Sequence, residues 1–266
     1  MDLGLEGKFA LVTGASHGIG RSIALALATE GVNVAICARN SPRPGYDGKL
    51  EETKAEIEST GVLSIAVSAD VLNPDDVCRV TETVTKAWGT VHVLVNNVGG
   101  GGSWGNPKVE ETPEDVWMDV YGKNALSAVR FTMWALPLMR KQKWGRVVSI
   151  TSIYGKEAGG RPWFNMAKAA ETSLMKNLAV NAELVRDGIT FNSVAPGGIM
   201  VPNTGWELQK ENSPTEFAQM IDGQFPLGRL GTPEEVASIV CFVCSEQATL
   251  LNGATISVDG GESKSF

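Results

Sequence analysis

The sequence has little of the features that mark membrane, secreted or nucleic-acid-binding proteins. No stretch reaches the roughly 18 consecutive apolar residues of a membrane-spanning helix, so we expect no membrane partner. Acidic residues outnumber basic ones by 30 to 23, and this net charge of −7 argues against a nucleic-acid partner, which usually meets a basic face. The first six residues, MDLGLE, have no basic flank or long apolar run, so we expect no secretory signal.

Cysteine and histidine are also scarce, with four and two residues. Cys241 and Cys244 are spaced C-x-x-C in a predicted amphipathic helix over residues 233–245, but no second Cys or His pair is available to complete a zinc site. We interpret the two as buried structural thiols and predict no metal. This cysteine usage is typical of a reducing compartment, so we expect a cytoplasmic protein.

Linkers, repeats and low-complexity segments are missing too. Length alone would allow two small domains, but nothing in the sequence marks a boundary. With 266 residues, 43% hydrophobic and 20% charged, the chain can bury the core of one large α/β domain. We therefore predict a single domain over residues 1–266.

What the chain does have is a regular alternation of short apolar runs and longer helical patterns. Predicted strands cover residues 9–13, 32–38, 64–67, 91–96, 146–151, 189–194 and 255–258. Helical patterns lie between them, among them 19–30, 75–88, 113–141 and 164–185. Continuous apolar strands that alternate with helices indicate parallel strands covered on both faces, as in a doubly wound, Rossmann-type sheet. Such sheets bind ligands beyond the carboxyl ends of their strands.

A glycine-rich turn follows the first predicted strand. Residues 13–20 read TGASHGIG, with the spacing G-x-x-x-G-x-G. Glycines allow a sharp turn and a close approach to a pyrophosphate, and the next helix offers its amino-terminal N–H groups. The turn alone could be a tight connection, but its place between strand and helix predicts a dinucleotide site. The expected binding residues are Gly14, Ser16, His17, Gly18, Ile19 and Gly20.

The end of the second strand indicates which dinucleotide is bound. An acidic residue there would bind both ribose hydroxyls of NAD, but this chain has Arg39 followed by Asn40. Arginine offers a planar donor fork to a 2′-phosphate. His17 is a candidate second donor, and a solvated Arg39 with no ligand is the alternative. We predict that NADP(H) is preferred over NAD(H).

Two further strand ends have polar or small residues that suit a cofactor. Asp70 and Val71 follow the third strand, where the carboxylate can accept from an adenine amino group and the valine can pack on the ring. Asn97 and Gly99 follow the fourth strand, where the amide can bridge strand ends and the glycine admits a ribose. Read alone, each could be ordinary loop chemistry.

Taken in order, these segments resemble the short-chain dehydrogenase/reductase family over essentially the whole chain, with its ketoacyl-reductase-like branch nearest. The resemblance is carried by the glycine turn, the motif NNVG at 96–99, Asn124, ITS at 150–152, the Lys168 helix, APG at 195–197, and the segments PLGRLGTPEE at 226–235 and VDGG at 258–261. It implies a nicotinamide oxidoreductase that interconverts a ketone and a secondary alcohol, and a homotetramer.

The resemblance also assigns roles to single residues. Ser152 matches the serine that hydrogen-bonds the substrate oxygen, and Asn124 matches the asparagine that anchors a water leading protons to solvent. Lys168 matches the lysine that binds the nicotinamide ribose and lowers the pKa of the catalytic tyrosine. Cofactor binding is further assigned to Pro196, Gly197 and Ile199.

The catalytic tyrosine of the family falls on Phe164, which has no ionisable group. Phe164 precedes Lys168 by four residues, so the two side chains share a helix face. Three explanations are open: an engineered Tyr-to-Phe change, a natural variant with another proton donor such as Tyr154, or a cofactor-binding protein that is a sensor or structural subunit without redox activity. Because general acids contribute ~10²–10⁴-fold, we predict normal cofactor binding and impaired reduction.

The substrate is expected to be an apolar or cyclic carbonyl compound. By resemblance, the pocket is bounded by segments 100–106, 154–163 and 199–225, which contribute large apolar side chains: Trp104, Tyr154, Trp163, Met200 and Trp206. The alternative is that the tryptophans only pack these loops together. The stretch 199–225 is predicted to form a lid that orders on binding. Val201 stands where the family usually has a threonine that contacts the carboxamide, and Thr204 is a possible substitute.

Overall fold

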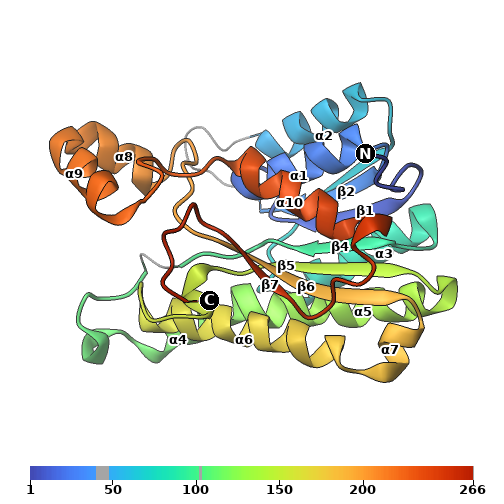
Figure 1. The fold of residues 1–266 in the computed structure, drawn as a ribbon. Helices are drawn as coiled ribbons and strands as arrows, with labels where there is room; N and C mark the ends of the chain where they lie inside the picture. Colours follow the sequence, from blue (N-terminus) through green and yellow to red (C-terminus); the bar gives the residue numbers. More distant parts are fainter. Residues whose placement is uncertain (40–47, 102–103, 266) are drawn as a thin grey trace.

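The computed structural model describes residues 1–39, 48–101 and 104–265, and it has one seven-stranded sheet between two layers of helices (Figure 1). The strand order is β3-β2-β1-β4-β5-β6-β7, and every pairing is parallel. The strands are β1 (Phe9–Thr13), β2 (Asn33–Ala38), β3 (Ser64–Ser68), β4 (Val93–Asn96), β5 (Gly145–Ile150), β6 (Ile189–Pro196) and β7 (Thr255–Val258). The predicted doubly wound sheet is therefore confirmed.

Helices cover both faces of the sheet, as the unbroken apolar strands require. One face carries α1 (Gly18–Thr29), α2 (Lys49–Ser59) and α10 (Pro233–Cys244). The other carries α3 (Pro74–Trp88), α4 (Glu114–Tyr121), α5 (Ser127–Gln142), α6 (Pro162–Ala179) and α7 (Ala182–Arg186). Short turns are η1 (Val109–Glu111), η2 (Gly122–Leu126), η3 (Ile153–Gly155) and η4 (Glu246–Ala248).

Two predicted helices are interrupted in the structure. The pattern over residues 113–141 is divided by η2, a π-helical segment that separates α4 from α5. The pattern over 164–185 begins two residues earlier, at Pro162, and breaks after Ala179. There the side chain of Asn181 accepts hydrogen bonds from the backbone N–H groups of Glu183 and Leu184 and starts α7. The apolar pattern of the sequence predicts neither break, because the buried face of the helix continues across both.

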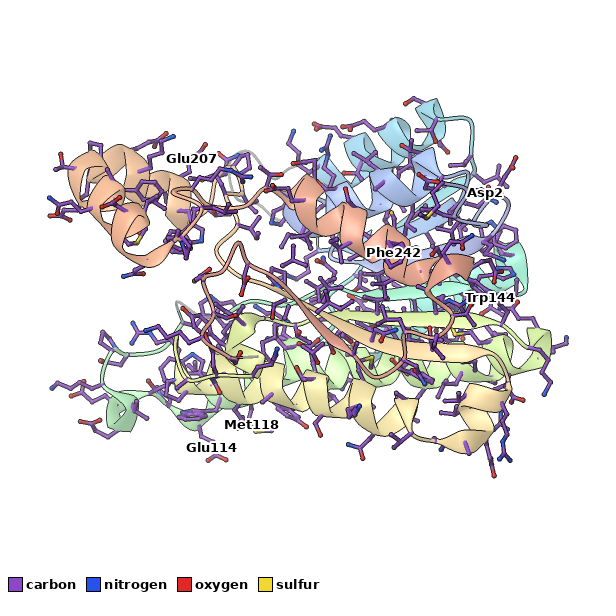
Figure 2. All side chains as sticks on the ribbon, in the orientation of Figure 1. Asp2, Glu114, Met118, Trp144, Glu207 and Phe242 are labelled. Carbon is purple, nitrogen blue, oxygen red and sulfur yellow. The ribbon has the colours of Figure 1, made fainter. Side chains whose placement is uncertain are left out.

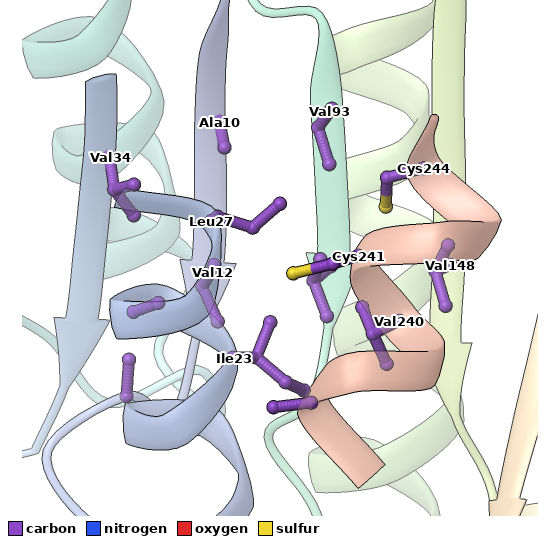
Figure 3. Close-up of a cluster of buried hydrophobic side chains, with 14 of the residues drawn as sticks. Ala10, Val12, Ile23, Leu27, Val34, Val93, Val148, Val240, Cys241 and Cys244 are labelled. Carbon is purple, nitrogen blue, oxygen red and sulfur yellow. The ribbon is translucent and has the colours of Figure 1, made fainter. Parts of the chain in front are cut away.

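The core on the α1–α10 face shows what the C-x-x-C pair does. Cys241 and Cys244 point from α10 into a cluster that includes Ile23, Leu27 and Val148 (Figure 3). Both thiols are free and buried, and burial raises the pKa of Cys241 to about 12. A thiol this buried is an inert packing group, so the interpretation as structural thiols is confirmed.

Beyond the carboxyl edge of the sheet, α8 (Gly205–Asn212) and α9 (Pro214–Gln224) project as a separate pair (Figure 1). They bury a small cluster of their own around Phe217, Phe225 and Leu230. This pair forms most of the predicted lid segment 199–225. Within the described ranges, none of the helices combines the length and hydropathy that a membrane span requires.

Candidate active site

A hollow of about 290 Å³ opens at the carboxyl edge of the sheet, where the predicted residues converge. It is bounded by Ile19, Asn97, Gly99, Gly100, Ile150, Thr151, Ser152, Phe164, Lys168, Pro196, Gly197, Ile199, Val201 and Trp206. Nine of the residues predicted for the cofactor or for catalysis are in this lining. Another hollow, of about 310 Å³, lies outside α3 and α5 around Trp134 and contains none of them.

The glycine turn is held in place by Thr13 and Asn97. The Thr13 hydroxyl donates to the Val95 carbonyl and accepts from the N–H groups of Asn97 and Val98. The Asn97 side chain donates to the carbonyls of Thr13 and Gly14, at 2.8 and 3.1 Å. Asn97 therefore fixes the protein's own turn, which is the bridging role predicted for it. A side chain at Gly20 would overlap its amide nitrogen, so glycine is required there.

The start of α1 is suited to an anion. His17 is the N-cap residue, but its side chain makes no capping bond to the first turn, and its Nδ1 lies 3.1 Å from the Ser16 hydroxyl. The first-turn N–H groups therefore keep the capacity to bind a ligand. Burial lowers the pKa of His17, which favours the neutral ring. Gly18, at φ +56°, takes the left-handed turn that the loop needs.

The two residues predicted to contact the adenosine end lie next to each other. Arg39 Nη1 is 3.7 Å from Asp70 Oδ2, and both side chains are exposed enough to exchange this contact for a ligand. Val71, the predicted packing neighbour, is buried, and its carbonyl accepts from Arg130. Asn40 lies outside the described residues.

Asn124 reaches the site because η2 turns its side chain inward. Its Oδ1 accepts from the Gly100 N–H at 3.1 Å, while its Nδ2 donates to the carbonyls of Gly100 and Val120. The side chain is fully buried and clamps the loop after β4. A methyl group on Gly99 would lie 2.6 Å from Asn124 Oδ1 and 2.8 Å from Lys168 Nζ. Glycine is therefore required at this position by the protein's own side chains, and the ribose contact predicted for it stays a prediction.

Ser152, Phe164 and Lys168 face the same hollow. The Ser152 hydroxyl caps η3 by accepting from the Tyr154 N–H at 3.2 Å, so the same hydroxyl can donate to a substrate oxygen. Lys168 Nζ lies 5.9 Å from the centre of the Phe164 ring. The site thus brings together the predicted serine and lysine with the hydrocarbon ring of Phe164.

Two carboxylates that contact residues of the lining, or the loop beside it, were missed by sequence reasoning. Glu171 is fully buried on α6, and its Oε2 accepts from Lys168 Nζ at 2.6 Å. Its signal was a glutamate on the buried helix face between Ala167 and Met175. Glu262, from the tail after β7, accepts from the Gly198 N–H at 2.6 Å and fixes the loop after Pro196 and Gly197. Nothing in its local sequence distinguishes it from a solvated tail residue.

The large apolar side chains divide into two groups. Trp206, on α8, lines the hollow and packs edge-on against Phe225. Trp163 is fully buried against Trp117, and its Nε1 donates to the Gly101 carbonyl. Trp104 packs in the same cluster, under the ammonium of Lys123. Trp163 and Trp104 therefore pack the loops together, which was the alternative to lining the substrate pocket.

Three other residues named from the sequence are outside the lining. Met200 packs in the α8–α9 cluster. Thr204 donates to the Val201 carbonyl at 2.6 Å, and it is Val201 that lines the hollow. Burial and the carboxylates of Glu262 and Glu157 raise the pKa of the Tyr154 phenol. This phenol is therefore a poor substitute acid.

The residues present suit a dinucleotide. Gly14 and Gly18 take the left-handed conformations that shape the turn, the α1 amino end offers donors, and the exposed Arg39 offers a guanidinium beside Asp70. The hollow then leads from this turn to Ser152 and Lys168. A bound nicotinamide would supply or accept the hydride, and the chain's own residues would position it and the substrate oxygen.

Comparison with known proteins agrees with this geometry. The family model described as Enoyl-(Acyl carrier protein) reductase matches residues 14–263. The 3-oxoacyl-[acyl-carrier-protein] reductase FabG of Staphylococcus aureus is 36% identical over 258 residues, covering 96% of this chain and 97% of that protein.

Solved structures extend the likeness to the fold. The L-sorbose reductase of Gluconobacter frateurii, complexed with NADPH and L-sorbose, is 33% identical, has a TM-score of 0.89 and aligns over 100% of both chains. A 7 alpha-hydroxysteroid dehydrogenase complexed with NADH and 7-oxo glycochenodeoxycholic acid is 28% identical, with a TM-score of 0.85 over 99% of this chain and 97% of that one. The chain belongs to the short-chain dehydrogenase/reductase family and, like FabG and the L-sorbose reductase, is an oxidoreductase that interconverts a ketone and an alcohol with NAD(P)H.

Proposed function

We propose that the protein is an NADP(H)-dependent oxidoreductase for an apolar or cyclic ketone and its secondary alcohol, with turnover limited by Phe164. The observation that carries the proposal is that Ser152, Phe164 and Lys168 line one hollow, with Asn124 holding the adjacent Gly100. In reduction, a hydride adds to the carbonyl carbon and a proton to its oxygen. Ser152 would donate a hydrogen bond to that oxygen, but Phe164 cannot supply the proton.

The lining supports an apolar substrate. Phe164, Ile199, Val201 and Trp206 form a largely hydrocarbon surface around the polar Ser152 and Lys168. The related structures contain ligands as different as L-sorbose and a keto steroid, so the preference must come from this chain's own side chains. Within the single domain, segment 199–225 would act as a lid that brings Trp206 onto the substrate.

Deuterium transfer tests the proposed activity. The protein and its Phe164→Tyr variant would be incubated with NADPH deuterated at the transferable position and a panel of cyclic and linear ketones. We expect deuterium at the carbinol carbon of the product, accumulating faster with the variant. No labelled alcohol from either protein, despite measurable NADPH binding, would contradict the oxidoreductase and favour the alternative: a cofactor-binding sensor or structural subunit.

Cofactor choice gives a second measurable expectation. Arg39→Ala should weaken NADPH binding about 10–100-fold and NADH binding by less than about threefold, because a charge-assisted hydrogen bond contributes roughly 1.5–3 kcal/mol. Fluorescence titration with both cofactors measures the ratio. Arg140→Ala is the matched control, since Arg140 pairs with Asp187 far from the hollow. An equal loss for NADH and NADPH would show that Arg39 does not bind the 2′-phosphate.

A homotetramer is proposed on the same family grounds. On the α4–α6 side, Met118, Met133 and Met166 are 60%, 68% and 44% exposed. Figure 2 shows Met118 pointing outward from α4. Exposed apolar side chains of this size are typical of protein interfaces. Native mass measurement would give the assembly directly, and a monomer at working concentration would rule it out.

A further inference from the structure

Glu171 is a buried acid that the proposed chemistry does not use. It lies three residues after Lys168 on α6 and is fully buried, so its carboxyl and the lysine ammonium meet on the inner face of the helix. Lys168 is itself 3% exposed. A charge buried this deeply requires a partner, and each of these two groups is the other's ion-pair partner.

Two hydrogen bonds fix the orientation of the Lys168 ammonium. An ammonium has three N–H donors. One is directed to the Ile150 carbonyl at 2.9 Å and one to Glu171 Oε2 at 2.6 Å. Glu171 is fully buried and outside the lining, whereas Lys168 lines the hollow. A single N–H therefore remains for the cofactor or the substrate.

The second oxygen of Glu171 is buried and, within the described part of the chain, has no hydrogen-bond partner, as is true of several polar side chains of the sheet. Asn96, Ser149 and Ser193 are register partners across β4, β5 and β6. They share a face with Val147 and Phe191, which pack against α5 and α6. Among the described residues, buried side-chain oxygens of these three and Glu171 Oε1 have no hydrogen-bond partner. Lys168 is therefore the one hydrogen-bond partner that the structure gives the Glu171 carboxyl within the described residues.

The Lys168–Glu171 ion pair lies next to the ring of Phe164. At position 164, one turn before Lys168, a phenol could become an anion next to the ammonium, but Phe164 cannot. The negative charge near Lys168 therefore comes from the opposite side, from Glu171. Burial raises the pKa of Glu171, and the ammonium of Lys168 opposes that rise.

We propose that Glu171 is a positioning residue, the internal counter-ion that holds Lys168 with one N–H toward the hollow and offsets its charge. The proposal rests on the proposed function, because it makes Glu171 act through Lys168 on the reacting group. A carboxylate here weakens the effect of the ammonium on any phenol at position 164. Removing its charge should make that phenol more acidic.

Other ionisable groups lie on the elements packed against α6. Apart from Glu183 in its control variant, they are the same in all the variants compared below, so their effect on the midpoint cancels in the comparison. Lys123 is on η2, and its ammonium lies over the Trp104 ring. The others are Tyr154 on η3, Lys156, Glu157 and Arg161 between η3 and α6, Glu114, Asp115, Asp119 and Tyr121 on α4, Glu183 and Arg186 on α7, and Arg146 on β5. No titratable side chain lies on β6, so the comparison isolates Glu171.

The experiment measures the ionisation of a single phenol. Phe164→Tyr, alone and combined with Glu171→Gln, would be titrated by ultraviolet difference absorbance of tyrosinate, with the parent protein subtracted. The midpoint should fall by on the order of one pH unit in the double variant, because a charge within a few ångströms shifts a pKa by about 1–3 units. Glu171→Asp keeps the charge and should move the midpoint by less than half as much. Glu183→Gln removes an exposed charge and is the control.

An unchanged or raised midpoint in the Gln variant would overturn the proposal. If that variant does not fold, Glu171→Met removes the same charge and predicts the same downward shift. The titration needs no substrate, so it can succeed even where no ketone is reduced. Failure of the proposed function would instead appear as the absence of labelled alcohol, whatever the midpoint does.

Discussion

Replacing Phe164 with tyrosine should raise kcat/KM for ketone reduction by about 10²–10⁴-fold, the usual contribution of a positioned general acid. The ring already lines the hollow next to Ser152 and Lys168, so one added oxygen would meet a site whose other members are in place. NADPH binding should change little, because the ring is at the substrate end. NADPH oxidation followed by absorbance, with the ketone panel, measures the gain.

Two further variants control for indirect effects of this change. Phe242→Tyr adds the same oxygen to an exposed ring on α10 and should leave the rate unchanged (Figure 2). Ser152→Ala in the Phe164→Tyr background should remove most of the gain, since the hydroxyl would no longer bind the developing oxyanion. Equal rates for the parent and Phe164→Tyr would mean that no phenol is missing from this site.

Much of the fold could be predicted from the sequence, because parallel strands buried on both faces appear as unbroken apolar runs. The predicted strands at 9–13 and 255–258 match β1 and β7 without change. Errors occurred where a backbone feature had no apolar signature. The π-helical turn at Asn124 and the cap at Asn181 depend on hydrogen bonds that periodicity does not record.

The candidate site was predictable where its chemistry is local and unpredictable where it depends on contacts between distant segments. The glycine turn, Ser152 and Lys168 lie at strand ends or on one helix face, which sequence spacing reveals. The ion pair of Arg39 with Asp70 joins the ends of two strands, and Glu262 reaches Gly198 from 64 residues away. The sequence around Trp206 and Trp163 does not distinguish their roles. The packing of the folded chain places Trp206 in the lining of the hollow and Trp163 in the core.

Glu171 shows how one buried pair can also set the stability of the whole protein. Lys168→Met should lower the free energy of unfolding by about 3–5 kcal/mol at pH 8, because it leaves Glu171 buried without its counter-ion. Methionine nearly matches the lysine stem in length, so packing should change little. Urea denaturation followed by tryptophan fluorescence measures the loss. Lys176→Met, on the exposed side of the same helix, is the control and should stay within about 0.5 kcal/mol.

The pH dependence of that loss identifies its cause. Without Lys168, burial holds the folded-state pKa of Glu171 above its unfolded value, so protonation favours the folded state. The penalty is therefore largest above the folded pKa and shrinks as pH falls toward the unfolded pKa of about 4.3. Lys168→Met should be closer to the parent in stability at pH 5 than at pH 8, and adding Glu171→Met should recover most of the loss at pH 8. A loss that is the same at both pH values, and that the second substitution does not repair, would mean that Lys168 stabilises the fold by packing and not by pairing with Glu171.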